Sequence, residues 1–256
     1  MNQSSLNGKV AIITGGGKGI GLGVAKAYAK EGVAVVLTGR TISTLEHGKR
    51  EIEEQVPGAK VLLCPGDGKD HEMAQRVVNK TIETFGRLDI VVNNAQQFLP
   101  DTRVENFTHE DLIATYESGL FAAWRYMVAA FPHLKAVEGT VINMGSASGT
   151  KSLVNECAYG GNKEAMRHLS RVAAKEWGEY GITVNVVCPA VASETALEYA
   201  AQNPDWEEAF LSEFPLRKWG DAELHVGGTC VFLAKPEGKY ITGSTIDVDG
   251  GFTIRP

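Results

Sequence analysis

Short apolar runs that alternate with helical segments constrain the fold of this chain more than any other feature. The runs are rich in Val, Ile and Leu, as expected for strands buried on both faces, and they cover residues 10–13, 33–37, 61–63, 90–92, 141–143, 182–187 and 245–248. Helical spacing fills residues 20–30, 43–55 and 71–85 between them. Alternating strands and helices imply right-handed crossovers and a parallel sheet covered on both faces. We therefore predict an α/β fold with a doubly wound sheet of seven parallel strands and helices on both faces.

The alternating units follow one another without a linker, a charge run or a low-complexity stretch. We therefore expect residues 1–256 to form a single domain. The long segment from Ala190 to Trp219 lacks clear periodicity. Such a segment in a compact domain is usually a lid or a binding loop, so a substrate lid is predicted at about 190–219.

Composition narrows the choice of partners and compartment. Lys and Arg number 25 against 31 Asp and Glu, whereas nucleic acids and anionic membranes bind basic surfaces. No apolar run approaches the roughly 20 residues that span a bilayer, and the first eight residues lack the pattern of a signal peptide. The four cysteines lie far apart and are interpreted as buried thiols, and the six histidines lack ligand spacing. We expect a cytoplasmic protein with no nucleic-acid partner, no membrane span and no metal site.

A glycine-rich turn, Thr14–Gly21, lies between the first predicted strand and the first helix. Glycines at such a turn allow positive φ and let the backbone approach a pyrophosphate held by the helix N-terminus. The common G-x-G-x-x-G spacing is not met; the spacing present is Gly15-xxx-Gly19-x-Gly21. The position after a buried strand favours a dinucleotide site over a mere tight corner.

This turn resembles the cofactor motif of the short-chain dehydrogenase/reductase family, and other landmarks follow in order. Asp67 resembles the family's adenine-contacting aspartate, Asn93-Asn94-Ala95 its Asn-Asn-Ala-Gly, and Asp247–Gly251 its closing strand and turn. The resemblance spans residues 8–251 and implies a Rossmann-type dinucleotide-binding and catalytic domain. The cofactor contacts that it implies are Gly15, Gly17, Lys18, Gly19, Ile20, Gly21, Arg40, Asp67, Asn94, Ala95, Tyr159, Lys163 and Pro189.

The charges around the turn favour NADP(H). An NAD site of this type would place an acid at the end of the second strand, for the ribose 2′-hydroxyl. Here that strand ends Leu37-Thr38-Gly39-Arg40, with no carboxylate before Glu46. Arg40 and Lys18 could converge on a 2′-phosphate. The alternative is that both are solvated surface cations.

Tyr159 and Lys163 stand four residues apart at the start of a helical pattern, so they share a helix face. Gly160 and Gly161 between them would weaken that helix by about 1 kcal/mol each, which indicates a close approach to the backbone there. Ser146 lies 13 residues upstream of Tyr159, after the fifth strand, at the family's serine spacing.

The resemblance implies a role for each of these three residues. Tyr159 gives its proton to the carbonyl oxygen during ketone reduction, and Ser146 donates a hydrogen bond to the same oxygen. Lys163 holds the nicotinamide ribose and, with the oxidised nicotinamide, lowers the pKa of Tyr159 by favouring phenolate. The alternative is a packed tyrosine, a surface lysine and a turn serine.

Three departures from the family pattern stand out. Gly119 occupies the place of the family asparagine that supports a lysine-linked water, and we expect the proton relay to survive in a weakened or rearranged form, with help from Ser118. Gln96 replaces the last glycine of Asn-Asn-Ala-Gly and either points into the substrate space or caps a loop. Pro189-Ala190 replaces Pro-Gly, and Glu194-Thr195 falls where one threonine meets the carboxamide, which puts the cofactor contacts of this loop in question.

The sequence thus predicts a cytoplasmic NADP(H)-dependent oxidoreductase that interconverts a ketone and a secondary alcohol. The predicted lid favours an apolar carbonyl compound through Leu197, Tyr199, Trp206, Phe210, Leu211 and Phe214. One alternative is a 3-oxoacyl-thioester reductase or a polyol or sugar dehydrogenase on the same fold, with Arg217-Lys218 as the candidate docking patch for a carrier protein. Another is a catalytically weakened nucleotide-binding module, because of Gly119. A homotetramer follows from the resemblance alone.

Overall fold

The computed structural model describes residues 4–97, 102–192, 197 and 200–254, and its centre is a seven-stranded sheet. The strand order is β3-β2-β1-β4-β5-β6-β7, and every neighbouring pair is parallel. The strands are β1 Val10–Thr14, β2 Ala34–Gly39, β3 Val61–Pro65, β4 Ile90–Asn93, β5 Thr140–Met144, β6 Thr183–Pro189 and β7 Thr245–Val248. The predicted doubly wound α/β fold is confirmed, and each predicted strand is present within a few residues of its expected bounds.

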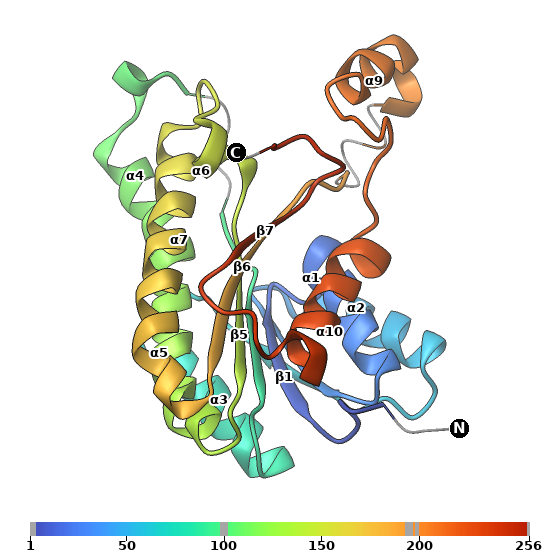
Figure 1. The fold of residues 1–256 in the computed structure, drawn as a ribbon, viewed down its shortest axis with the longest axis vertical. Helices are drawn as coiled ribbons and strands as arrows, with labels where there is room; N and C mark the ends of the chain where they lie inside the picture. Colours follow the sequence, from blue (N-terminus) through green and yellow to red (C-terminus); the bar gives the residue numbers. More distant parts are fainter. Residues whose placement is uncertain (1–3, 98–101, 193–196, 198–199, 255–256) are drawn as a thin grey trace.

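Helices cover both faces of the sheet because side chains alternate along each strand. Ala11 and Ile13 of β1 belong to one buried cluster with α1 (Gly19–Lys30), α2 (Ile42–Gln55) and α10 (Gly228–Ala234). Val10 and Ile12 belong to a second cluster, with α3 (Met73–Phe85), α5 (Ala122–Lys135) and α7 (Cys157–Trp177). Figure 1 shows these two helical layers on opposite sides of the sheet.

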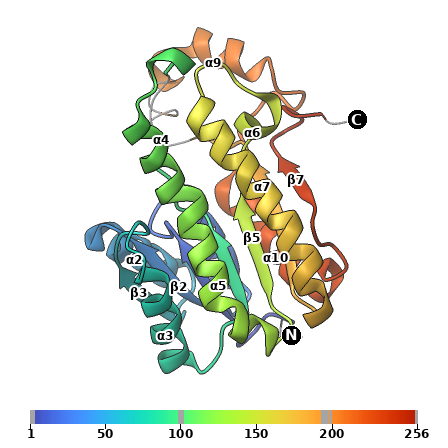
Figure 2. The same cartoon turned by 90° about the vertical axis from the view of Figure 1, so that its left-hand side faces the viewer.

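The helices on the α5 and α7 side extend beyond the carboxyl ends of the strands. Helix α4 (His109–Tyr116) continues through a π-helical segment, Glu117–Phe121, directly into α5. In Figure 2 this long rod runs beside α7, with the short α6 (Ala147–Lys151) near the amino end of α7. A π-turn inside a helix often marks a functional site, and this one lies at the height where the strands end.

The predicted lid contains a helix that its sequence pattern did not reveal, α9 (Pro204–Leu211), which stands away from the sheet in Figure 1. Aromatic rings of α9 and of the residues after it stack on one another, with centroids 5.3 Å apart for Trp206–Phe210, 5.1 Å for Phe210–Trp219 and 4.8 Å for Phe214–Phe252. Glu194, Thr195 and Tyr199 lie outside the described residues.

The cysteine expectation is only partly correct. All four cysteines are free; Cys64, Cys188 and Cys230 are buried, but Cys157 is exposed. Cys157 is the first residue of α7, where the outward face of the helix carries it to the surface. In the described part of the chain, no helix combines the length and apolarity needed to cross a bilayer, and no cluster of three His, Cys, Asp or Glu could hold a metal ion.

Candidate active site

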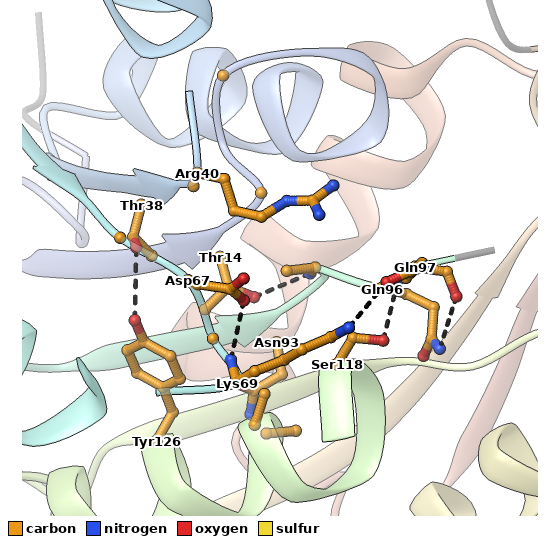
Figure 3. A pocket seen from close by; sticks show the side chains of 18 of the residues that line it. Thr14, Thr38, Arg40, Asp67, Lys69, Asn93, Gln96, Gln97, Ser118 and Tyr126 are labelled. Atoms are coloured by element: carbon orange, nitrogen blue, oxygen red, sulfur yellow. Dashed lines mark hydrogen bonds between the residues drawn. The ribbon is translucent and has the colours of Figure 1, made fainter. Parts of the chain in front are cut away.

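A pocket with a cavity volume of about 280 Å³ opens at the carboxyl ends of β1, β2 and β4. The strand order reverses between β1 and β4, and open α/β sheets bind ligands at such a switch point. Figure 3 shows the side chains that line it. The predicted site residues among them are Gly15, Gly17, Lys18, Arg40, Asp67, Ala95 and Lys163.

Thr14 fastens the glycine turn to the loop after β4. Its Oγ1 accepts hydrogen bonds from the backbone N–H groups of Asn94 and Ala95, both at 2.9 Å. The Asn94 side chain donates in return to the Thr14 carbonyl at 2.9 Å. Asn94 therefore acts on the turn itself and does not line the pocket.

The turn requires its glycines for two separate reasons. Gly15 and Gly19 adopt positive φ of 65° and 54°, which side chains rarely tolerate. A Cβ at Gly21 would overlap the Gly15 carbonyl oxygen, and one at Gly17 would lie 2.9 Å from the Thr44 oxygen. The first turn of α1 is thereby pressed against the strand, as a pyrophosphate cradle needs. Gly19, Ile20 and Gly21 shape this turn without lining the pocket.

Two exposed cations, Lys18 and Arg40, stand at the pocket. In Figure 3, Arg40 extends from the end of β2 above Asp67. The Asp67 carboxylate accepts the Lys69 backbone N–H at 3.0 Å, and Lys69 Nζ donates to Gln97 Oε1 at 3.1 Å. Sequence reasoning missed Lys69 and Gln97, although each follows a predicted landmark by two residues.

Ser146 and Tyr159 meet beside this pocket. Ser146 is the N-cap of α6, and its Oγ accepts the Ser148 backbone N–H at 3.2 Å. Because Ser146 Oγ also lies 2.9 Å from Ser148 Oγ, a proton from Ser148 leaves the Ser146 hydroxyl free to donate elsewhere. The Ser146 side chain is hydrogen-bonded to Tyr159. The predicted pair is thus brought together by α6 and the first turn of α7.

Lys163 is buried, with 4 % of its surface exposed, and it joins this pair to the pocket. Its Nζ donates to the Met144 carbonyl at 2.7 Å and lies 5.5 Å from the centroid of the Tyr159 ring. This arrangement excludes the alternative of a surface lysine. Pro189 ends β6 opposite Val248 and lies outside the pocket lining.

The protein's own groups raise the pKa of Tyr159 to about 12, opposite to the expected effect of Lys163. Burial is the largest cause, because it disfavours the charged phenolate; the Ser146 hydrogen bond acts in the other direction. Burial also lowers the pKa of Lys163 to about 8. The expected lowering involves the oxidised nicotinamide as well as Lys163, so it stays a prediction for the enzyme with bound cofactor.

The glycine pair after Tyr159 meets the expected close approach at one position. A Cβ at Gly160 would lie 2.7 Å from the Ser148 carbonyl oxygen, whereas one at Gly161 would meet only the Tyr116 hydroxyl, at 3.1 Å. The backbone of α6 therefore packs directly on Gly160. This contact sets the separation between the Ser146 turn and α7.

Gln96 both lines the pocket and reaches away from it. Its Nε2 donates to the carbonyls of Gln97 and Thr115, both at 3.2 Å, and its Oε1 accepts from Asn162 Nδ2 at 2.7 Å. Asn162 is fully buried, and its Oδ1 accepts the Leu120 N–H at 2.9 Å. Sequence reasoning missed Asn162, whose one signal was its place directly before Lys163.

Comparison with known proteins gives a consistent picture. A family model described as Enoyl-(Acyl carrier protein) reductase matches residues 15–253. A 12alpha-hydroxysteroid dehydrogenase from Clostridium sp. is 41% identical over 257 residues, covering 98% of each chain. An L-fucose dehydrogenase from Bos taurus is 33% identical, covering 95% of this chain and 89% of its own. The crystal structure of L-sorbose reductase from Gluconobacter frateurii, complexed with NADPH and L-sorbose, superposes with a TM-score of 0.90 at 29% identity, covering 98% of both chains.

Proposed function

This chain belongs to the short-chain dehydrogenase/reductase family of oxidoreductases, and we propose that it interconverts a ketone and a secondary alcohol. In this proposal NADP(H) is the hydride carrier and Tyr159 is the general acid or base. The observation that carries the proposal is the continuity of the site. Lys163, which lies beside Tyr159, lines the same pocket as Arg40 and Asp67. A cofactor that extends from Arg40 to Lys163 would place its reactive end at the tyrosine.

The residues present fit a dinucleotide. The Gly15–Gly21 turn exposes backbone at the start of α1, where N–H groups bind phosphate. Asp67 stands where an adenine contact is expected. Asn93 lines the same pocket, and its buried Oδ1 has no hydrogen-bond partner among the residues that the structure describes. An unpartnered buried acceptor of this kind is expected where a bound group or water completes the site.

Two cations favour NADP(H) over NAD(H). Lys18 and Arg40 line the pocket together, and Arg40 follows the strand end at which an NAD site would carry an acid. A guanidinium binds phosphate oxygens with paired hydrogen bonds, and it binds a neutral 2′-hydroxyl less strongly. The structural neighbour solved with NADPH supports the same cofactor.

NADPH, when bound, would supply the hydride that reduces the carbonyl carbon. In this direction Tyr159 donates its proton to the carbonyl oxygen, and its raised pKa keeps it protonated at neutral pH. Ser146 donates a hydrogen bond to the same oxygen, where negative charge develops. In alcohol oxidation Tyr159 takes the proton back as phenolate. Lys163 would hold the ribose hydroxyls, and its Nζ is kept in place by the hydrogen bond to the Met144 carbonyl.

We place the substrate between the Ser146–Tyr159 pair and a lid at 190–219, and we treat residues 1–256 as one catalytic domain. The stacked rings of Trp206, Phe210 and Trp219 give this lid an aromatic framework, which favours an apolar carbonyl compound. The relatives are named for a hydroxysteroid and for sugars. An oxosteroid, a ketohexose, an aromatic ketone and a 3-oxoacyl thioester are therefore the compounds to test.

The test is NADPH oxidation with each of these four compounds, comparing the wild-type enzyme with Tyr159→Phe. We expect turnover with at least one ketone and its loss in Tyr159→Phe, because phenylalanine has no proton to give. Tyr240→Phe is the matched control, since Tyr240 is fully exposed. Turnover that survives in Tyr159→Phe would overturn the assigned role. NADPH binding without turnover of any compound would favour the idle nucleotide-binding module.

Two observations support the alternative of a 3-oxoacyl-thioester reductase. The matched family model is described by an acyl-carrier-protein substrate, and Arg217 and Lys218 are exposed in the lid segment, where an acidic carrier protein could dock. Turnover of the thioester that falls sharply in Arg217→Ala/Lys218→Ala, with the ketones unaffected, would select this alternative.

A homotetramer in the cytoplasm completes the proposal. Trp124 and Val128 on α5 are 49% and 51% exposed, and Val172 on α7 is 38% exposed. Figure 2 shows α5 and α7 side by side on one outer face. Exposed apolar side chains on paired helices favour burial against a second copy. Light scattering coupled to size-exclusion chromatography tests it, and a monomer at micromolar concentration would contradict it.

A further inference from the structure

We propose that Gln96 and Asn162 form a hydrogen-bonded pair of positioning residues that takes the place of a side chain at position 119. The pair holds Lys163 in position relative to the π-helical segment, so that proton transfer at Tyr159 can proceed. The inference rests on the proposed function. It concerns three positions that are distant in sequence: Gln96 and Gly119, which both depart from the family pattern, and Asn162, whose side chain meets both of them.

The first step is the space around Gly119. A Cβ built on this residue would overlap both Gln96 Oε1 and Asn162 Nδ2, and it would lie 2.9 Å from Asn162 Oδ1. The volume beside the Gly119 backbone is thus already occupied by two side-chain amides. Glycine is required here by packing, since its φ lies outside the positive range. The side chain that Gly119 lacks is thus replaced by the side chains of Gln96 and Asn162.

The second step is that the two amides are bonded to each other and to three chain segments. Asn162 Nδ2 donates to Gln96 Oε1 at 2.7 Å, and Asn162 Oδ1 accepts from the Leu120 N–H at 2.9 Å. Gln96 Nε2 donates to the Thr115 carbonyl at 3.2 Å. The pair therefore connects the loop after β4, the π-helical segment and α7. The fully buried Asn162 amide would be costly without these partners, so the three segments are held in one arrangement.

The third step is what this arrangement positions. Asn162 immediately precedes Lys163, and both side chains are buried. Fixing Asn162 to the Leu120 N–H fixes the axial position and rotation of α7 where Lys163 leaves it. The π-helical segment also carries Ser118, whose Oγ accepts the Gln97 N–H at 3.2 Å and faces the same pocket as Lys163 (Figure 3). The amide pair thus sets the gap between Lys163 and the opposite wall of the pocket.

Ser118, which was expected to help the proton relay, has a structural role in this arrangement. Ser118 Oγ donates to the Thr115 carbonyl at 3.1 Å, the same carbonyl that Gln96 approaches. That carbonyl belongs to the last turn of α4, directly before the π-helical segment in which the regular helical ladder is interrupted. Ser118 therefore supports the backbone of the segment, and the amide pair occupies the space beside Gly119.

The experiment compares Asn162→Ala, Gly119→Asn and the combined Gln96→Gly/Gly119→Asn/Asn162→Ala variant. We expect kcat to fall about 100-fold in Asn162→Ala, a loss typical of small misplacements in an active site, while the KM for NADPH stays within about twofold. Gly119→Asn alone is expected to fall at least as far, because its side chain meets both amides. The combined variant, which frees that space, is expected to recover to within about tenfold of wild type.

The matched control is Asn185→Ala. Asn185 is also fully buried, and it bonds the Ile241 carbonyl and the Ser244 N–H, on β6 and away from the pocket. We expect it to lower the melting temperature as Asn162→Ala does, without the loss of kcat per folded molecule. If both variants behave alike in kcat, or if Gly119→Asn is as active as wild type, the proposal is wrong.

A readout independent of turnover separates this proposal from the proposed function. Hydrogen exchange of the Leu120 amide should accelerate in Asn162→Ala and stay unchanged in Asn185→Ala. A wild-type enzyme without ketone reductase activity would overturn the proposed function. The exchange rate of the Leu120 amide would then test the amide pair alone.

Discussion

Lys163 Nζ donates a hydrogen bond of 2.7 Å to the main-chain carbonyl of Met144, which ties α7 to the last residue of β5. The ammonium group is held in place by a neutral acceptor, and burial is the main cause that lowers its pKa to about 8. Lys163 is therefore an ionisable group kept inside the protein at a cost in stability, as expected of a group retained for function.

Unfolding should show this cost as a pH dependence. Between pH 8 and 10.5 the unfolded chain binds a proton at Lys163 that the folded protein has lost, so this group makes stability rise with pH in that window. We expect the free energy of unfolding of wild type, measured relative to Lys163→Met, to increase by about 3 kcal/mol across it. Urea unfolding of both proteins at several pH values measures the difference.

Lys175→Met is the control for this measurement, because Lys175 is exposed further along the same helix. The difference in free energy of unfolding between wild type and Lys175→Met should not rise with pH in this way. A flat difference between wild type and Lys163→Met over this window would show that Lys163 keeps its proton in the folded protein.

Ser146→Ala should shift the pH dependence of alcohol oxidation upward. The Ser146 hydrogen bond is the cause that lowers the pKa of Tyr159, against burial, which raises it to about 12. Without that bond the phenolate forms at higher pH, so the alkaline rise in the oxidation rate moves to higher pH. Ketone reduction uses the protonated phenol and should stay flat between pH 6 and 9. We expect kcat for reduction to fall about 100- to 1,000-fold with the loss of one donor.

Initial rates in both directions from pH 6 to 11 provide the measurement, with Ser4→Ala as a distant control. An oxidation profile in Ser146→Ala that coincides with that of wild type would refute the role given to this hydrogen bond.

The sequence predicted best what depends on local pattern. The strands, the glycine turn and the spacing of Ser146, Tyr159 and Lys163 are all set by neighbours along the chain, and the structure brings these three residues together as expected. The π-helical segment and α9 were not predicted, because the first departs from helical periodicity and the second is a short helix in a segment without a clear pattern.

What the sequence could not give depends on contacts between distant segments. Taken singly in the sequence, Gln96, Gly119 and Asn162 indicate no role. Their role follows from the structure, where the Gln96 and Asn162 side chains fill the space beside Gly119. The raised pKa of Tyr159 has a similar origin: its largest cause is burial by the surrounding segments, which the sequence does not reveal. Cys157 was assigned to the interior from composition alone, whereas the outward face of α7 exposes it.

Arg40→Ala should reduce the preference for NADPH. Arg40 is exposed at the pocket beside Lys18, and a charged hydrogen bond to phosphate contributes about 1.5–3 kcal/mol. We expect the KM for NADPH to rise about 10- to 100-fold, with little change for NADH, which has no 2′-phosphate. Arg50→Ala, an exposed arginine of α2 away from the pocket, is the control. Equal effects on both cofactors would argue against a 2′-phosphate contact.

Gly160 and Gly161 offer a matched pair for testing how α6 positions Ser146. Alanine at Gly160 places its Cβ 2.7 Å from the Ser148 carbonyl oxygen, which is backbone and must move. Ser148 donates its N–H to Ser146 Oγ, so this movement carries Ser146 away from Tyr159. We expect Gly160→Ala to lower kcat about 100-fold and to destabilise the fold by about 1–3 kcal/mol.

Alanine at Gly161 meets only the hydroxyl end of Tyr116, at 3.1 Å, and that side chain can give way. Gly161→Ala should therefore keep kcat within about twofold and stabilise the helix by about 1 kcal/mol, the usual gain of alanine over glycine. Steady-state kinetics and thermal unfolding of the two variants measure both effects. Similar kcat values in the two variants would show that the contact between α6 and Gly160 does not set the position of Ser146.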